Sequence, residues 1–320
     1  MKTVSQLTDF YYVTLYPKLK DLEEKRNKTR FRLILFIITV VLSAIFVFIM
    51  LMRNNIPAFE AFIFLGMFSF STIVYIIKHL SKEYKQKFKD EIFHPLIKEI
   101  DTNLKYLQDN HISATKFNAS NLFGRPDRIN GNDHISGRID EVAIEFSDVH
   151  AERKQKNNKD KDKWVTIFQG LYIITDFPKE FHGKTYIFPD IAEKTFGNLI
   201  GGWIQSNNFR KEQLVKMDNV EFEKYFAVYS TDQIEARYIL SHSLMQKIVT
   251  LRKKANHNLS ISFANNHLYI AINYGKDLFE PSLFQSLLDY KVAMEYIQVL
   301  SMTLGLVREL KLNEKLWSKH

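Results

Sequence analysis

Residues 33–52, LILFIITVVLSAIFVFIMLM, are twenty successive residues without a charged side chain. A helix of that length rises about 30 Å, which matches the hydrocarbon core of a bilayer. A buried helix of a soluble protein usually keeps a polar face, and this run has none. The run therefore predicts a transmembrane helix, and that prediction limits what the rest of the chain can be.

A second apolar run covers residues 56–77, and the polar residues 53–55 separate it from the first. Its one charged residue, Glu60, lies in the first turn or so, where a carboxylate can reach the membrane interface. The two runs predict a transmembrane helical hairpin over residues 33–77. Neither run has a charge deep inside it, so the hairpin is interpreted as an anchor and not as part of a transporter or channel.

The flanking charges predict the orientation of the hairpin. Residues 1–32 contain eight Lys and Arg, six Lys follow the second run up to residue 98, and the connecting turn offers only Arg53. Because basic residues stay on the cytoplasmic side, both termini are expected there, with two membrane spans between them. Residues 1–32 are expected to form an amphipathic helix and residues 78–100 a stalk helix. The predicted partners are the bilayer itself and, through the basic flanks, anionic lipid headgroups.

Residues 101–320 predict a cytoplasmic α+β domain. Strand patterns with antiparallel hairpins come first and helices later, which is the order typical of this class. Strands are expected at 138–153, 164–177, 184–188 and 225–230 and on both sides of Asn265-Asn266. Residues 125–137 look like a turn because of the pair Asn130-Gly131. Ser241 is expected to cap one helix, and Ser282 to cap a long C-terminal helix that breaks near Gly305. A division into two subdomains near residue 232 is left open.

The stretch SDVHAE, residues 147–152, carries the candidate catalytic residues. In a strand, Asp148, His150 and Glu152 would share one face, where they could bind a metal ion or form an acid–base relay. Neighbours on one strand face are about 7 Å apart, so one ion would need further ligands from elsewhere in the chain. The charged, apolar-free residues 154–163 follow directly. The favoured interpretation is therefore a strand that leaves the core and ends in water.

Other features count against catalysis without excluding it. The chain has no Cys, which removes thiol nucleophiles and Cys-ligated metal sites. It also has no nucleophile elbow, phosphate-binding loop, zinc-protease motif or dinucleotide fingerprint. No cofactor, no metal and no nucleic-acid partner are therefore expected. Whether the protein is an enzyme stays undecided, with the balance against it.

Several strings together resemble a known family. They are the apolar hairpin, IEFSDVHAE, TIFQGLYIITDF, GKTYIFPD, EFEKYFAVYSTDQIEARYIL and DLFEPSLF. In this order they resemble a bacterial membrane-protein family known only as domain of unknown function 3137. The resemblance implies a bacterial cytoplasmic-membrane protein. It implies no activity and no catalytic residues.

Two functions follow as hypotheses. The preferred one is a membrane-anchored, cytoplasm-facing binding or scaffold module without catalysis, which would act with an unknown protein partner or as a homo-oligomer. The alternative is a membrane-bound hydrolase or metal-dependent enzyme that uses the strand face of Asp148, His150 and Glu152.

Overall fold

A computed structural model describes residues 2–53, 58–156, 162–177, 182–190 and 213–310. The predicted turn at 54–55 and the centre of the charged tip, 157–161, lie outside these residues. The chain divides into two compact units. Unit 1 is Met1–Ile100 with Glu280–Ile297, and unit 2 is Asp101–Phe279 with Gln298–His320.

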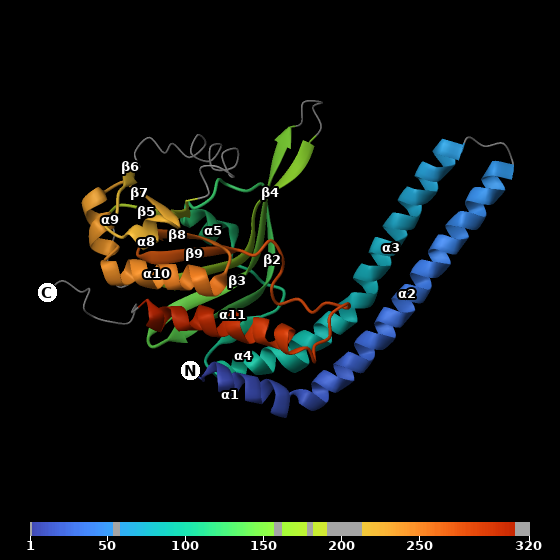
Figure 1. The fold of residues 1–320 in the computed structure, drawn as a ribbon, viewed down its shortest axis with the longest axis horizontal. Helices are drawn as coiled ribbons and strands as arrows, with labels where there is room; N and C mark the ends of the chain where they lie inside the picture. The colour runs from blue at the N-terminus through green and yellow to red at the C-terminus, as the bar shows by residue number, and fades with distance from the viewer. Residues whose placement is uncertain (1, 54–57, 157–161, 178–181, 191–212, 311–320) are drawn as a thin grey trace. The chain divides into compact units, whose positions relative to one another are not determined.

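Unit 1 is helical (Figure 1). Two of its helices, η1 and η2, are short π-helices that join α-helices. Pro17 lies in the first turn of α2, where a missing N–H is tolerated. In chain order the helices are α1 (Val4–Asp9), η1 (Phe10–Thr14), α2 (Tyr16–Arg53), α3 (Ala58–Phe88), η2 (Lys89–Phe93), α4 (His94–Ile100) and the start of α11 (Tyr290–Glu309).

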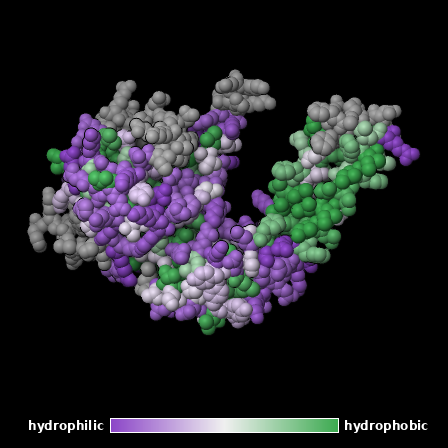
Figure 2. Space-filling view, in the orientation of Figure 1, coloured by the Kyte–Doolittle hydropathy of each residue, from purple (hydrophilic) through white to green (hydrophobic). Residues whose placement is uncertain are grey.

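Helix α2 has the length and composition of a membrane span. It is the one helix among the described residues with that property, and only 6% of its most apolar 18-residue stretch is buried. Apolar side chains such as Leu42 (60% exposed) and Phe46 (65% exposed) point away from the protein. Figure 2 shows the resulting hydrophobic surface along α2 and α3. The second predicted span lies within α3, which runs beside α2, and its crossing of a membrane stays a prediction.

The other end of the same helices buries charged groups. Arg26 is 4% exposed, and its Nη1 donates a hydrogen bond to the carbonyl oxygen of Leu283 at 2.7 Å. The Lys89 side chain is 1% exposed, and its Nζ lies 3.3 Å from a carboxylate oxygen of Glu280. The other oxygen of Glu280 lies 2.9 Å from Nζ of Lys85. These polar contacts hold the irregular segment 280–288 against α2, α3 and η2 within unit 1.

Unit 2 is built on one nine-stranded sheet in which every described strand pair is antiparallel. The spatial order is β1-β2-β3-β4-β9-β8-β5-β7-β6. The strands are β1 (Lys105–Leu107), β2 (Arg128–Ile139), β3 (Val142–Lys156), β4 (Asp162–Asp176), β5 (Thr185–Pro189), β6 (Gln213–Val215), β7 (Phe226–Ser230), β8 (Asn258–Ala264) and β9 (His267–Asn273). The predicted α+β class with antiparallel hairpins is confirmed.

Short capped helices connect these strands. The hydroxyl groups of Ser113 and Ser241 accept hydrogen bonds from the first turns of α5 and α10, so the predicted cap at Ser241 is confirmed. Among the residues that the structure describes, the helices of unit 2 are α5 (Ala114–Ala119), α8 (Val220–Glu223), α9 (Gln233–Ile239), α10 (His242–Ala255) and the end of α11. Helix α11 starts at Tyr290, not at Ser282, and continues through Gly305, so the predicted start and break of the C-terminal helix are wrong.

Both faces of the sheet are buried at its centre. On one face, Phe117 of α5 packs in a core with Val149 and Ala151 of β3 and Tyr172 of β4. The opposite face carries Phe146, which is also fully buried. Alternation along β3 therefore sends successive side chains into two different packed environments.

Residues 125–137 are not a turn, which corrects the sequence-based expectation. Most of them form β2, with Asn130 opposite His150 and Gly131 opposite Val149. A Cβ on Gly131 would lie 2.1 Å from the carbonyl oxygen of Asp148, so this glycine permits close approach of two strands and does not form a hairpin turn. Strands from both sides of residue 232 belong to the one sheet, while the predicted domain boundaries stay a prediction.

Candidate functional site

The candidate catalytic residues lie on β3, as predicted. Asp148 pairs with Leu171 and His150 with Gln169 on β4, so these two share a face by strand alternation. The pairing register shifts between Ala151 and Glu152, where one extra residue of β4 is accommodated. Such a bulge re-aims the side chains that follow it.

Asp148 is buried and does not face water. It is 1% exposed, and its Oδ2 accepts hydrogen bonds from the backbone N–H groups of Leu278 (2.8 Å) and Phe279 (3.3 Å). Its Oδ1 has no hydrogen-bond partner among the described residues. Burial, together with the nearby carboxylate of Asp133, raises the pKa of Asp148 to about 8. The side chain therefore fastens the segment at 278–279 and is largely uncharged at neutral pH.

Asp133 reaches this region because β2 has a bulge. The register between β2 and β3 shifts between Asn132 and Ile135, and Asp133 adopts a left-handed backbone conformation with φ of 57°. Asp133 is fully buried, and its Oδ1 accepts a hydrogen bond from the hydroxyl group of Tyr106 at 2.5 Å. The bulge thus places a second acidic side chain near Asp148.

His150 and Glu152 have partners of their own. The Nε2 atom of His150 lies 2.9 Å from the hydroxyl oxygen of Thr166 and 3.9 Å from a carboxylate oxygen of Glu152. Glu152 is 7% exposed and accepts a hydrogen bond from Nε of Arg128 at 2.8 Å. The guanidinium group of Arg128 in turn lies 4.2 Å from the ring centre of Trp164.

The structure therefore does not join the three candidates into one reactive group. Asp148 binds a backbone segment, His150 contacts a threonine and Glu152 pairs with an arginine. Within the described ranges, no group of three or more His, Asp or Glu side chains is placed so that it could hold a metal ion. The expectation that this strand face ends in water is wrong for Asp148 and Glu152, which are both buried.

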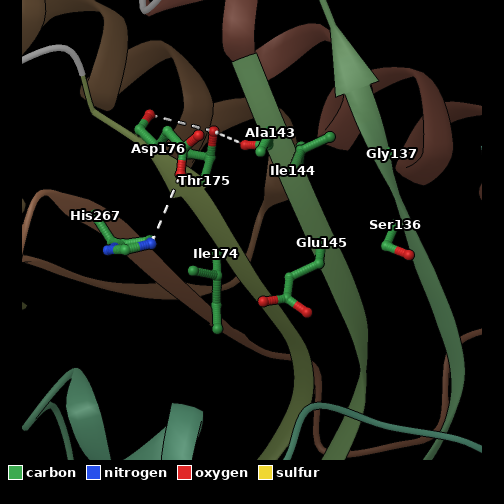
Figure 3. Close-up of a pocket in the computed structure, with 9 residues that line it drawn as sticks. All are labelled: Ser136, Gly137, Ala143, Ile144, Glu145, Ile174, Thr175, Asp176 and His267. Carbon is green, nitrogen blue, oxygen red and sulfur yellow. Dashed lines mark hydrogen bonds and ion pairs between the residues drawn. The ribbon is translucent and has the colours of Figure 1, made fainter. Parts of the chain in front are cut away.

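A separate hollow of about 190 Å³ lies over four neighbouring strands of the sheet (Figure 3). Ser136 of β2, Glu145 of β3, Ile174 of β4 and His267 of β9 come from these strands in turn. The hollow is also lined by Gly137, Ala143, Ile144, Thr175 and Asp176. The hydroxyl group of Thr175 donates a hydrogen bond to the carbonyl oxygen of Ala143 at 2.9 Å and ties β4 to β3 at this edge.

Two carboxylate groups that line this hollow, Glu145 and Asp176, each lie close to a histidine. Nε2 of His134 lies 3.1 Å from Glu145, which also accepts hydrogen bonds of 2.6 and 2.8 Å from Nζ of Lys116. Burial alone would raise the pKa of Glu145, but its bonds to His134 and Lys116 outweigh burial and lower this pKa below the usual value. His267 lies 3.6 Å from a carboxylate oxygen of Asp176, as the dashed line in Figure 3 marks.

The chemistry of the hollow suits binding of a small polar group. The Glu145 carboxylate stays ionised, and the exposed Asp176 and His267 side chains can exchange hydrogen bonds with a ligand. Sequence reasoning missed these residues. The available signal was the charge of Glu145 within AIEF and of Asp176 within IITDF, where acidic residues interrupt apolar strands.

Comparison with known proteins adds a family and no activity. Residues 166–312 match the family described as protein of unknown function (DUF3137), which confirms the predicted resemblance over that part of the chain. No curated protein matches the sequence. The fold is similar to the crystal structure of the mycobacterial trehalose monomycolate transport factor A, TtfA, with a TM-score of 0.35, 10% sequence identity, and coverage of 66% of this chain and 90% of that chain. A likeness at this TM-score says nothing about what the present chain binds.

Proposed function

We propose, for a chain whose residues 166–312 match a family of unknown function, that it is a membrane-anchored binding or scaffold module without catalytic activity. Helices α2 and α3 form the anchor as two spans of a bacterial cytoplasmic membrane. Both termini and unit 2 lie on the cytoplasmic side, where unit 2 meets its partner.

The observation that carries this proposal is the exposed apolar surface of α2. From Ile34 to Met52 the helix exposes a large apolar side chain at most positions, and soluble monomers rarely expose apolar patches beyond a few hundred Å². Met67, Phe68 and Phe70 of α3 are likewise more than 60% exposed. A lipid environment removes this surface from water, which makes the arrangement stable.

The basic residues that flank these helices support the orientation. Arg30 and Arg32 precede the apolar part of α2, Lys78 and Lys82 follow that of α3, and only Arg53 lies near the connection. This distribution matches two spans with cytoplasmic ends.

The contacts of the candidate catalytic residues support a module without catalysis. His150 and Glu152 approach each other to 3.9 Å, but Asp148 binds a backbone segment instead, so the three side chains do not form one group. The hollow at Glu145 and His267 supplies polar groups that suit recognition of a ligand or partner.

Single-cysteine labelling tests the anchor, because the chain has no Cys of its own. Asn55→Cys places a thiol between the two predicted spans, and Val220→Cys places one on unit 2 at a residue that is 74% exposed. In intact spheroplasts, a membrane-impermeant maleimide should label Asn55→Cys and should label Val220→Cys only after permeabilisation. Labelling of Val220→Cys in intact spheroplasts, or recovery of the protein in the soluble fraction, would contradict the proposal.

Metal analysis of the detergent-purified protein tests the alternative enzyme. Wild type and His150→Ala should both lack stoichiometric metal and should have the same thermal midpoint within about 2 °C. A stoichiometric metal that His150→Ala loses would show that the Asp148, His150 and Glu152 face is a metal site.

A further inference from the structure

The β3–β4 hairpin continues beyond its neighbours in the sheet. Pairing of β3 with β2 ends at Glu152, opposite Arg128, and pairing of β4 with β9 ends at Leu171. Strands β3 and β4 pair with each other as far as Lys156 and Asp162. Residues 153–156 and 162–165 therefore form a two-stranded arm, which Figure 1 shows projecting from the sheet.

The arm is strongly basic. Its residues 153–156 and 162–163 contain four Lys and Arg, one Asp and no apolar residue. Arg125, which precedes β2, adds an exposed basic residue near the base of the arm, where its carbonyl oxygen lies 3.5 Å from the guanidinium group of Arg153. A surface of this charge attracts an anionic partner.

One large aromatic residue lies among these charges. Trp164 is 38% exposed and stands opposite Lys154 in the strand pair. The Arg128 guanidinium group lies 4.2 Å, and Nζ of Lys154 5.3 Å, from the centre of its ring. These cation–π contacts hold the ring at the surface of the arm instead of in a core. Tryptophan beside Lys and Arg is the combination enriched at the interface between lipid headgroups and hydrocarbon.

We propose that this arm docks on an anionic lipid surface, with Trp164 entering the headgroup region and the basic residues contacting lipid phosphates. The proposal rests on the membrane anchor proposed above, because the anchor keeps a bilayer within reach of unit 2. Charge complementarity and the tryptophan favour lipid over an acidic protein. A bilayer offers hydrocarbon for the Trp164 ring and, just above it, anionic headgroups for the two cations beside the ring.

The test uses the full-length chain in nanodiscs, which expose both bilayer faces and so remove any effect of orientation. Gln155→Cys, in a chain without other cysteines, carries an environment-sensitive fluorophore on the arm. Lipids with a quencher near the headgroup report contact with the bilayer. Quenching is expected in discs that contain about 30% anionic lipid, and it should fall in neutral discs and at high salt because the attraction is electrostatic.

A charge-matched pair of variants makes the test specific. Lys154→Gln/Lys156→Gln/Lys163→Gln should lower the docked-to-free ratio on the order of a hundredfold, since each basic residue near an anionic surface contributes about fivefold. Lys247→Gln/Lys253→Gln/Lys254→Gln removes the same charge from α10 and should leave quenching unchanged. Trp164→Ser should reduce the depth of quenching while much of its salt dependence remains.

The outcomes separate this proposal from the anchor. If the chain enters nanodiscs but its probe is not quenched at any lipid composition, arm docking is overturned and the anchor stays intact. Equal quenching in neutral and anionic discs would also overturn it. Crosslinking of the unquenched arm to an acidic protein in native membranes would assign the arm to that class of partner instead. A chain that remains soluble would contradict the anchor itself.

Discussion

The two ends of α2 differ in which side chains they expose and which they bury. Between Ile34 and Met52 the helix exposes apolar side chains, and only 6% of its most apolar 18-residue stretch is buried. Between Tyr16 and Leu33 it buries Leu19 and Leu22 together with the charged Arg26. A helix in one solvent would bury its apolar residues along its whole length. The contrast therefore separates an end of α2 that packs within protein from an end whose apolar surface is uncovered in the structure and that we propose to lie in lipid.

The buried charges at the protein end have specific partners. Arg26 is satisfied by the carbonyl oxygen of Leu283 and by Glu23, and Lys89 lies beside Glu280. A charge removed from water without such partners would cost several kcal/mol. The hydrophobicity of α2 alone therefore does not predict which part of the helix is buried in protein. A charged residue such as Arg26 is buried where other groups of the protein contact its charge.

The largest expected effect comes from charging the lipid end. Leu42→Asp/Phe46→Asp places two carboxylates at side chains that are 60% and 65% exposed. Each acidic residue at the centre of a span disfavours insertion by roughly 2.5–3.5 kcal/mol, so the pair should strongly reduce the fraction of protein recovered in carbonate-washed membranes.

The matched control charges two apolar residues of unit 2 that are more exposed than Leu42 and Phe46. Val220→Asp/Ile234→Asp changes side chains that are 74% and 80% exposed, and membrane recovery and the thermal midpoint should stay close to wild type. Similar behaviour of the two double variants would mean that the apolar half of α2 faces water, and the contrast between its ends would lose its explanation.

Asp148 extends the comparison to a buried acid without a basic partner among its described contacts. Burial and the Asp133 carboxylate raise its pKa to about 8, so the folded protein keeps this proton while the unfolded chain releases it above about pH 4. Unfolding then releases a proton, and stability should fall as pH rises from about 4 to about 8, by at most about 1.4 kcal/mol per pH unit. Asp148→Asn should remove this part of the pH dependence and raise the thermal midpoint at about pH 8.

Thermal midpoints measured across this pH range check the prediction. Asp176→Asn, at a side chain that is 52% exposed on β4, removes a carboxylate from the same sheet and is the control. If Asp148→Asn and wild type show parallel curves, the Asp148 carboxyl is ionised in the folded protein, and its contacts with Leu278 and Phe279 are those of a carboxylate.

Local patterns predicted much of the fold. The strands at β3 and β4, the Asn265-Asn266 turn and the Ser241 cap come from short-range features, and the structure has all of them. The strand β2 was missed because Gly131 and Asp133 serve a close strand approach and a bulge, which look like turn signals in a sequence. The start of α11 was missed because segment 280–288 is held by tertiary contacts to Arg26 and Lys89.

The candidate site was predictable only in part. Strand spacing placed Asp148, His150 and Glu152 on β3, but their partners come from residues 278–279, from Thr166 and from Arg128. Leu278 is 130 positions from Asp148, and no local pattern encodes that pairing. The burial of this strand face therefore could not be predicted from the sequence and became visible only in the tertiary structure.

The smallest expected effect concerns the protein end of the helices. Lys89→Met removes a side chain that is 1% exposed and leaves Glu280 with Lys85 as a charged partner at 2.9 Å. Loss of one member of a buried ion pair costs roughly 3–5 kcal/mol when the other is left alone, and the remaining lysine should reduce this to about 1–3 kcal/mol. The thermal midpoint in detergent should fall accordingly. Burial by itself raises the pKa of Glu280, and the two lysines lower it, so the same variant should also move that pKa upward.

Lys87→Met is the control for this change. It removes a lysine two positions away whose partner, Glu83, is 79% exposed, and such a surface pair should contribute little to stability. A fall in midpoint for Lys89→Met alone would show that the charges at this end of unit 1 are compensated inside the protein, as their contacts indicate. Equal midpoints for the two variants would mean that water reaches Lys89, and the protein end of these helices would then be less tightly packed than its buried leucines imply.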